Sequence, residues 1–116
     1  MRGFKTSEFQ LFEYLVSLTQ NELKSYVADV LKNKYSQIVI TKDYVCAVGD
    51  IPIALVAHLD TVFKKPVSNL YYDTRKNVCW SPEGLGADDR AGVYSILHIL
   101  RNTKLRPHII FTTDEE

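Results

Sequence analysis

Hydrophobic residues recur at helical spacing in two segments near the start of the chain. Residues 7–18 form a compact amphipathic segment, and a second segment starts at Thr19. There Thr19 and Glu22 have the S/T-x-x-E spacing of a capping box, which marks the amino terminus of a helix. The apolar positions that follow fall on one helical face: Leu23, Tyr26, Val27, Val30 and Leu31. We therefore predict two helices, of which the second packs one face against the rest of the fold.

After these helical segments the pattern changes to that of strands. Residues 37–41 and 44–48 flank a short polar pair and predict a hairpin. Residues 51–57 form a near-continuous apolar run, which is typical of a strand covered on both faces. Pro52 lies at the start of this run, where strands tolerate proline, and His58 follows at its carboxyl end.

The second half of the chain repeats the alternation of strand and helix. Residues 70–73 and 77–80 predict another short hairpin, followed by a loop that contains proline and glycine. A helix is predicted over 88–101, and residues 108–113 read as another buried strand. The apolar positions of that helix again keep helical spacing: Val93, Ile96, Leu97 and Leu100.

The strand, helix, strand order over residues 51–113 is that of a crossover unit, which predicts an α/β fold. We expect three α/β/α layers, with a mixed, largely parallel sheet and helices on both of its faces. In such sheets ligands bind beyond the carboxyl ends of the strands. This rule places four polar residues on one rim of the sheet: His58, Asp60, Glu115 and Glu116.

Length and composition restrict the class of protein. A chain of 116 residues with 46% hydrophobic content can bury one modest core, so we expect a single domain or part of one. Its 14 basic and 14 acidic residues balance, which argues against nucleic acid or an anionic membrane as partner.

No apolar run reaches the roughly 18 residues of a membrane span, and residues 1–10 lack the apolar core of a signal peptide. Cys46 and Cys79 form no CxxC pair, which favours reduced thiols and a cytoplasmic protein.

The candidate chemistry lies in three acid-rich segments, residues 58–60, 86–92 and 112–116, each beside an apolar run. Imidazole and carboxylate groups are ligands for a divalent cation such as zinc, and a doubled glutamate can supply both a ligand and a proton acceptor. Each segment alone has an ordinary explanation, because paired aspartates commonly cap helices and terminal acids are commonly solvated. Together, in this order, they predict half of a two-metal hydrolase site. His98 and His108 lie away from the rim, and we expect packing or surface roles for both.

These segments resemble motifs of the co-catalytic zinc exopeptidase and deacylase superfamily, with the closest pattern in peptidase T-like metallopeptidases. Residues 58–61 are similar to the HxDT motif of the family, residues 86–92 to its GADDKAG motif, and residues 112–116 to its T-x-D-E-E motif. The resemblance covers most of the chain, although residues 1–50 match only in general layout. It implies that residues 1–116 form the amino-terminal part of a catalytic domain, truncated and without the lid or dimerisation domain.

The resemblance also implies a role for each acid. His58 would ligate one metal, Asp88 would bridge two, and Glu116 would ligate the second. Glu115 would act on the catalytic water, and Asp60 would orient the imidazole of His58. The implied cofactor is Zn²⁺, two ions in a complete site, with Co²⁺ or Mn²⁺ as possible replacements. No other cofactor is implied.

Further features follow from the same resemblance. The peptide bond between Asp88 and Asp89 would be cis, and Arg90 departs from the commoner lysine of the motif. The remaining ligands, another acid and a distant histidine, lie in the family beyond the position of Glu116. The implied substrate is a small peptide or an N-acyl amino acid. We also expect self-association through an exposed sheet edge at the strand that ends at Thr113.

Three hypotheses about function stay open at this point. The first is a metal-dependent hydrolase of peptide or amide bonds, present as an incomplete half-site. The second is a catalytically inactive remnant of the same fold that binds metal or serves in assembly. The third is an ordinary small α/β binding module whose acidic residues only cap helices and increase solubility.

Overall fold

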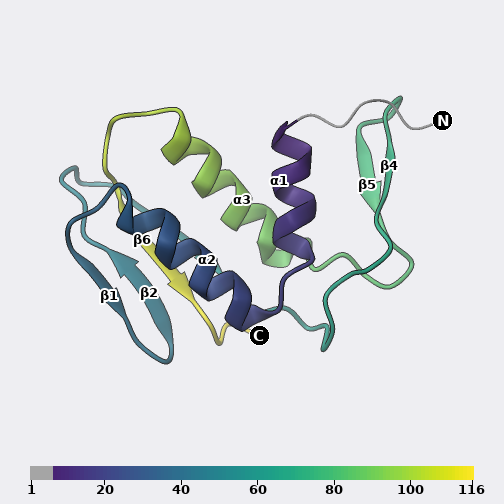
Figure 1. Ribbon diagram of the computed structural model, residues 1–116, viewed down its shortest axis with the longest axis horizontal. Coiled ribbons are helices and arrows are strands. Elements are labelled where there is room, and N and C mark those ends of the chain that lie inside the picture. Colours follow the sequence, from purple (N-terminus) through teal and green to yellow (C-terminus); the bar gives the residue numbers. More distant parts are fainter. Residues whose placement is uncertain (1–6) are drawn as a thin grey trace.

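The computed structural model describes residues 7–116. Residues 1–6 lie outside the described part, and the expectation that residues 1–10 carry no export signal falls mostly on them and stays a prediction. Figure 1 shows the elements in chain order, which are α1 (Ser7–Val16), α2 (Gln20–Lys32), β1 (Ile38–Ile40), β2 (Tyr44–Ala47), β3 (Ala54–His58), β4 (Tyr71–Asp73), β5 (Val78–Trp80), α3 (Ala87–Arg101) and β6 (His108–Thr112).

The capping box at the start of α2 is confirmed. The Thr19 hydroxyl accepts a hydrogen bond from the Glu22 backbone N–H at 3.2 Å, and the Glu22 carboxylate accepts one from the Thr19 N–H at 2.8 Å. These two bonds satisfy N–H groups that have no partner within the helix, and so they fix its first turn. The predicted apolar face is buried in the core, with Leu23, Val27 and Leu31 fully inaccessible to solvent.

Four strands form one mixed sheet in the order β1-β2-β6-β3. β3 pairs with β6 in parallel, whereas β1 with β2 and β2 with β6 pair antiparallel. The α/β class and the mixed sheet are therefore confirmed, but among the described strands the sheet is not largely parallel. The reason is the hairpin of β1 and β2, which is antiparallel within itself and places β2 antiparallel beside β6.

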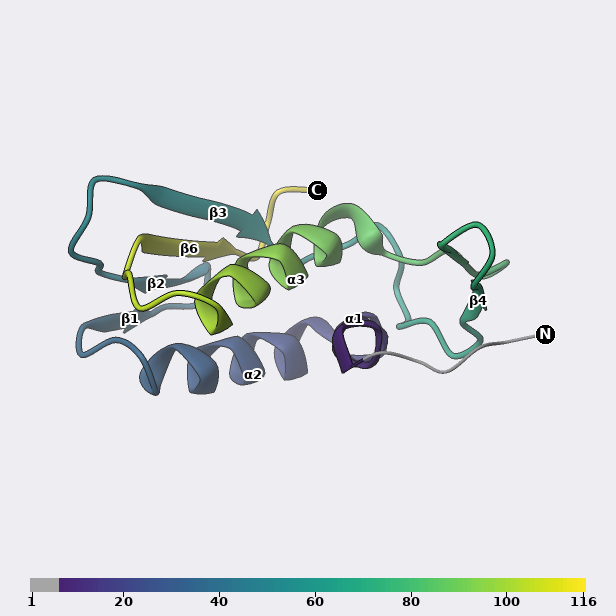
Figure 2. The ribbon, with the colours of Figure 1, turned by 90° about the horizontal axis from the view of Figure 1, so that it is seen from above.

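The helices cover one face of this sheet. Figure 2 shows α2 and α3 on the same side of the strands. In β6, Ile109 and Phe111 point to the helices and are fully buried, while Ile110 on the opposite face is only half-buried. Within residues 7–116 the fold thus has two layers, and the second helical layer that we predicted is not seen there.

β3 differs most from its sequence-based prediction. Its strand begins at Ala54, three residues later than expected, and Val56 is 60% exposed, so the apolar run is not covered on both faces. The reason is the one-sided helical layer, because α2 and α3 lie on the other face of the sheet and the outer face of β3 carries no helix within residues 7–116. β6, which we expected to form the free edge, lies instead between β2 and β3.

The second hairpin, β4 with β5, is confirmed and forms a separate two-stranded sheet. Tyr71 and Trp80 stack on each other across it at a centroid distance of 4.8 Å, which agrees with a packing role for these aromatic residues. Within residues 7–116, Cys46 and Cys79 form no disulfide. No helix in residues 7–116 is long and apolar enough to span a membrane.

We predict that the core depends strongly on Phe111, which is fully buried in the central strand β6. Phe111→Ala should lower the free energy of unfolding by about 3–5 kcal/mol, because it removes the ring and leaves a cavity. Urea denaturation followed by circular dichroism measures this difference. Val62→Ala, at a side chain that is 69% exposed, is the control and should change stability by less than about 0.5 kcal/mol. An equal effect of both substitutions would contradict the assigned core.

Candidate metal centre

His58 lies at the carboxyl end of β3 and is only 9% exposed. Its Nδ1 atom is 2.9 Å from the backbone carbonyl oxygen of Asp60. A carbonyl oxygen can only accept, so Nδ1 carries the hydrogen of this contact. The chain that turns after β3 thereby fixes the imidazole ring and leaves Nε2 directed away from the strand, which is the arrangement of a metal-ligating histidine.

Asp88 approaches Nε2 from the start of α3. Gly86 adopts a left-handed conformation with φ of 71°, and the following Asp88-Asp89 peptide bond is cis, as the resemblance implied. Both aspartates have non-helical backbone angles, so they precede the regular part of the helix. Asp89 caps it by accepting a hydrogen bond from the Gly92 N–H at 3.1 Å. The Asp88 side chain instead lies 3.0 Å from Nε2 of His58 and is 85% exposed.

Asp60 joins the end of β3 to the end of the chain. Its buried carboxylate accepts hydrogen bonds from the backbone N–H groups of Glu116 at 2.8 Å and Glu115 at 3.2 Å. Burial alone would raise the pKa of Asp60, but these two bonds, a bond from its own backbone N–H and the nearby His58 together hold the pKa below its usual value. The carboxylate is 3.4 Å from Nδ1 of His58, farther than the carbonyl oxygen of the same residue. Asp60 therefore orients His58 mainly through its backbone, while its side chain positions the two glutamates.

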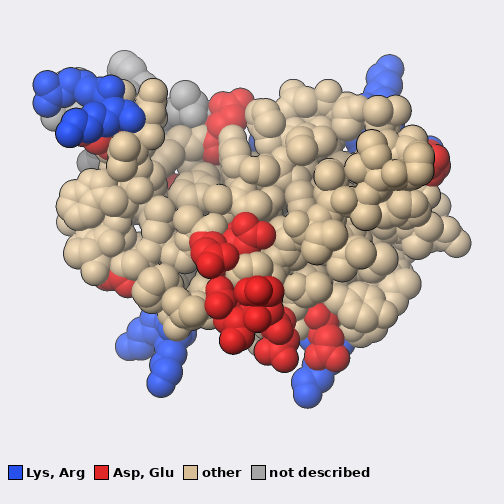
Figure 3. All heavy atoms as spheres, turned by 180° about the vertical axis from the view of Figure 1, so that it is seen from behind, with Lys and Arg blue, Asp and Glu red and all other residues tan. Residues whose placement is uncertain are grey.

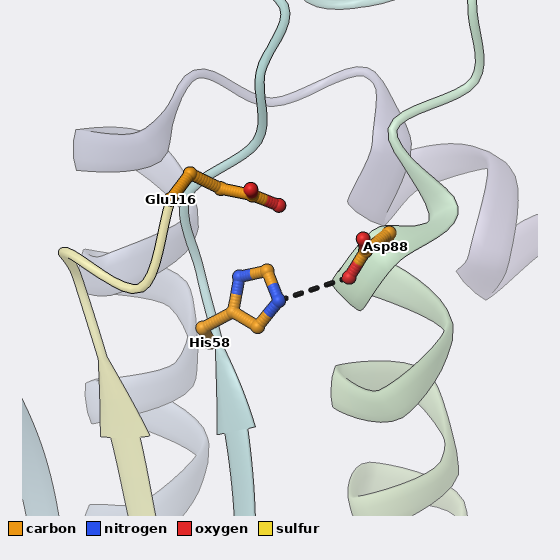
Figure 4. A group of neighbouring side chains, drawn as sticks. All are labelled: His58, Asp88 and Glu116. Atoms are coloured by element: carbon orange, nitrogen blue, oxygen red, sulfur yellow. Dashed lines mark hydrogen bonds and ion pairs between the residues drawn. The ribbon is translucent and has the colours of Figure 1, made fainter.

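Three side chains from distant parts of the sequence converge at this rim. Donor atoms of His58, Asp88 and Glu116 all lie within 4.8 Å of one another. Figure 4 shows the imidazole between the two carboxylates, one from the start of α3 and one from the end of the chain. The Glu115 carboxylate is also close, at 3.5 Å from Nε2 of His58. All five candidate residues named from the sequence thus lie together, although their roles stay predictions.

The donor set fits a divalent cation. Nε2 of His58 faces carboxylate oxygens, which can only accept, so either a proton on Nε2 or a bound cation must lie between them. Burial would lower the pKa of His58, but hydrogen bonds to Asp88 and Asp60 and nearby negative charge raise it. Partial burial and the neighbouring Asp88 and Glu115 raise the pKa of Glu116. A divalent cation would relieve this excess of negative charge, and Figure 3 shows the acidic side chains gathered in one area of the open face.

Arg90 is a structural residue of the site that the sequence reading did not recognise as buried. It is 5% exposed, and its guanidinium donates to the carbonyl oxygens of Leu59 at 2.9 Å, Leu15 at 2.8 Å and Leu18 at 3.0 Å. Arg90 thereby ties the exit of β3 to the start of α3 and to the end of α1. Burial lowers the pKa of Arg90, which the charge of Asp60 partly offsets. An arginine next to acidic residues at the start of a helix is normally expected on the surface. No signal in the sequence therefore distinguished Arg90 as a buried residue.

The other two histidines lie outside the site, as expected. His98 stacks on Tyr94 within α3 at a centroid distance of 5.9 Å. Nδ1 of His108 accepts a hydrogen bond from the Gly49 N–H at 2.9 Å, at the opposite end of β6 from the acidic rim.

A small cavity of about 170 Å³ lies between the loop that follows Asp60 and the loop that precedes Asp88. Lys64 and Lys65 contribute to its lining, but none of the five candidate residues does.

Comparison with known proteins finds similarity in structure and not in sequence. No protein-family model matches the chain, and no curated protein matches it. A tripeptidase from Staphylococcus aureus subsp. aureus Mu50 aligns with a TM-score of 0.65 at 21% identity, covering 91% of this chain and 35% of the tripeptidase. The aminoacylhistidine dipeptidase from Vibrio alginolyticus aligns with a TM-score of 0.64 at 20% identity, covering 94% of this chain and 28% of the dipeptidase.

These matches confirm the expected resemblance at the level of fold. The chain has the fold of one part of two peptidases, and it spans about a third of the length of those proteins.

We predict that Arg90→Met destabilises the protein by about 2–4 kcal/mol, because three carbonyl oxygens would lose their donor. Thermal and urea unfolding measure the change. Arg101→Met, in the exposed last turn of the same helix, is the matched control and should cost less than about 1 kcal/mol. If both variants unfold at the same denaturant concentration, Arg90 does not hold the elements together.

Proposed function

We propose that this chain is part of a metal-dependent hydrolase of peptide or amide bonds, with His58, Asp88 and Glu116 as metal ligands. The convergence of these three donors within 4.8 Å, from three separate segments, carries the proposal. A structural role for the cluster would not require so much negative charge around one imidazole. The peptidase fold of the two similar structures supports the same class of reaction.

Zinc bound here would polarise the scissile carbonyl and lower the pKa of water. The residues of the chain supply the rest. His58 binds through Nε2 because its Nδ1–H is held by the Asp60 carbonyl. Asp88, whose side chain is 85% exposed, would hold both ions of a complete site, as the resemblance implies. Glu115 takes the proton of the attacking water, and its backbone is held by the Asp60 carboxylate, so Asp60 is a positioning residue.

The proposal also states which part of an enzyme the chain forms. We take residues 1–116 as the amino-terminal part of a catalytic domain, with the remaining ligands on other residues of a complete enzyme. The proposed substrate is a small peptide or an N-acyl amino acid, in line with the names of the similar proteins, a tripeptidase and an aminoacylhistidine dipeptidase. Cys46 and Cys79 lie far apart in the sequence and form no CxxC pair, and on this ground we propose a reducing compartment such as the cytoplasm.

A second candidate function is a metal-binding or assembly domain of the same fold without activity. The openness of the site favours it, because Asp88 is 85% and Glu115 59% exposed at their side chains. Water would fill the remaining coordination positions, and the isolated chain would bind metal more weakly than a complete enzyme. Metal binding and turnover, measured separately, distinguish the two functions.

We predict that the chain binds Zn²⁺ and Co²⁺ and that Glu116→Gln weakens binding by about tenfold or more, because an amide is a poor ligand for these ions. Isothermal titration calorimetry and the visible spectrum of the Co²⁺ form measure the effect. Asp114→Asn removes a neighbouring exposed acid outside the donor cluster and should change affinity by less than about twofold. Equal losses in both variants would mean that only diffuse negative charge attracts the metal.

We predict that Glu115→Gln abolishes zinc-dependent hydrolysis of dipeptides and tripeptides while leaving zinc affinity within about threefold, since a proton acceptor is lost and no ligand is removed. Turnover is followed by release of free amino acid, with Asp114→Asn again as control. Zinc binding without turnover, both in this chain and in a longer protein that contains it, would favour the second function. Absence of zinc binding even in the longer protein would reject both and leave the small α/β binding module.

A further inference from the structure

The cavity between the loop that follows Asp60 and the loop that precedes Asp88 is lined by positive charge. Its walls come from three internal segments of the chain, residues 16–20, 61–67 and 84–90. The basic side chains of its lining are Lys64, Lys65 and Arg90, and no acidic side chain among residues 7–116 lines it. Neither lysine forms an ion pair with a carboxylate of the described residues. The lining therefore favours a negatively charged ligand.

Arg90 directs part of its guanidinium into this cavity. Its Nε and Nη1 atoms donate to the carbonyl oxygens of Leu59, Leu15 and Leu18, whereas Nη2 donates to no described residue. Among residues 7–116, no side-chain nitrogen or oxygen is both fully enclosed and without a partner, so Nη2 borders open space. Because Arg90 is only 5% exposed and lines the cavity, that open space is the cavity. The N–H groups of Nη2 are suited to a carboxylate oxygen.

The start of α2 favours a ligand of the same sign. Thr19 and Gln20 line the cavity, and the first N–H groups of a helix carry a partial positive charge. The Thr19 hydroxyl accepts from the Glu22 N–H and leaves those of Gln20 and Asn21 without a partner within the described residues. The Glu22 carboxylate is bonded to the Thr19 N–H and does not line the cavity.

Two loops hold the walls of the cavity together. The Phe63 ring lies against Gly84, where a Cβ atom would come within 2.3 Å of it. The Glu83 carboxylate accepts hydrogen bonds from the backbone N–H groups of Ser68 at 3.2 Å and Asn69 at 3.0 Å. These contacts join the loop after Asp60 to the loop before Asp88, so the cavity is formed without a ligand.

The remaining lining is mostly apolar and the space is small. Its apolar side chains are those of Val16, Leu18, Phe63, Pro66, Val67 and Leu85. A water molecule takes about 30 Å³ of liquid, so about 170 Å³ has room for one amino-acid residue and not for a long peptide. The ligand that fits is one residue with a free carboxylate and an apolar side chain.

We propose that this cavity binds the carboxyl-terminal residue of the substrate, with its carboxylate at Lys64, Lys65 and Arg90. The inference rests on the proposed function, because both proposed substrates, a small peptide and an N-acyl amino acid, have a free carboxylate. The cavity would then select such substrates over those with an amidated end.

The cavity lies within reach of the proposed metal ligands. Thr61 and Gly86 line it, and Gly86 precedes Asp88 by two residues. Consecutive Cα atoms are about 3.8 Å apart, so the wall begins within about 8 Å of the Asp88 Cα. An extended peptide covers about 3.3–3.6 Å per residue, so a carboxylate one or two residues beyond the scissile bond spans this distance.

Nuclear magnetic resonance titration of the metal-free chain tests the proposal, since without metal the carboxylate cannot bind zinc instead. We expect N-acetylleucine to shift the backbone amide signals of Thr61, Lys65 and Gly86. N-acetylleucinamide, which has no charge, should bind at least about fivefold more weakly. Acetate, which has the carboxylate without the side chain, should bind at least about threefold more weakly.

A pair of double variants tests the two lysines. Lys64→Met with Lys65→Met should weaken N-acetylleucine binding at least about tenfold, because the charges are lost while the apolar stems remain. Lys76→Met with Lys104→Met removes the same net charge at exposed positions outside the cavity and should change affinity by less than about twofold. Circular dichroism verifies that both variants are folded. Arg90 is left unchanged because it also holds the framework.

Four outcomes would overturn the proposal. They are no binding of N-acetylleucine, signal shifts away from the cavity, equal binding of the amide or of acetate, and equal losses in the two double variants. Zinc titration of the same chain tests the proposed function separately. Zinc binding without N-acetylleucine binding would reject the inference alone, whereas the reverse would leave a carboxylate site and reject the proposed function.

Discussion

The parallel pairing of β3 with β6 is the constraint on which the site depends. It aligns His58 with Thr112, so the residues after both strands emerge at the same edge of the sheet. The Asp60 carboxylate then holds the backbone of Glu115 and Glu116 against the end of β3. Parallel strands gather polar residues that are far apart in sequence, which is why such edges commonly bind ligands. Here it brings an imidazole and two glutamates into one cluster.

The distribution of charge around this cluster explains why it suits a cation. Arg90, the nearest buried positive charge, is directed to three backbone carbonyl oxygens and not to the carboxylates. It stabilises the framework without neutralising the site. Asp88 and the two glutamates are left with one imidazole between them. The protein therefore separates the charge that holds its elements together from the charge that is available for a ligand.

Within the described residues, the donor cluster and the side of β3 that has no partner strand meet at His58. His58 is both the last residue of the exposed strand and the central donor of the cluster. Any strand that pairs with β3 ends or begins next to the site and changes its surroundings. The chain covers only about a third of the two similar peptidases.

The sequence by itself determined the elements and the segments that carry the chemistry. The capping box at Thr19, the apolar helix faces and the three acid-rich segments are local patterns, because they depend on spacing along one helix or strand. Sequence could not show that of two adjacent aspartates Asp89 caps the helix while Asp88 faces His58, since this depends on the backbone turn before α3. Nor could it show that β6 is internal and β3 an edge, or that Arg90 is buried. Strand order and burial arise from contacts between distant segments, and only the tertiary structure decides them.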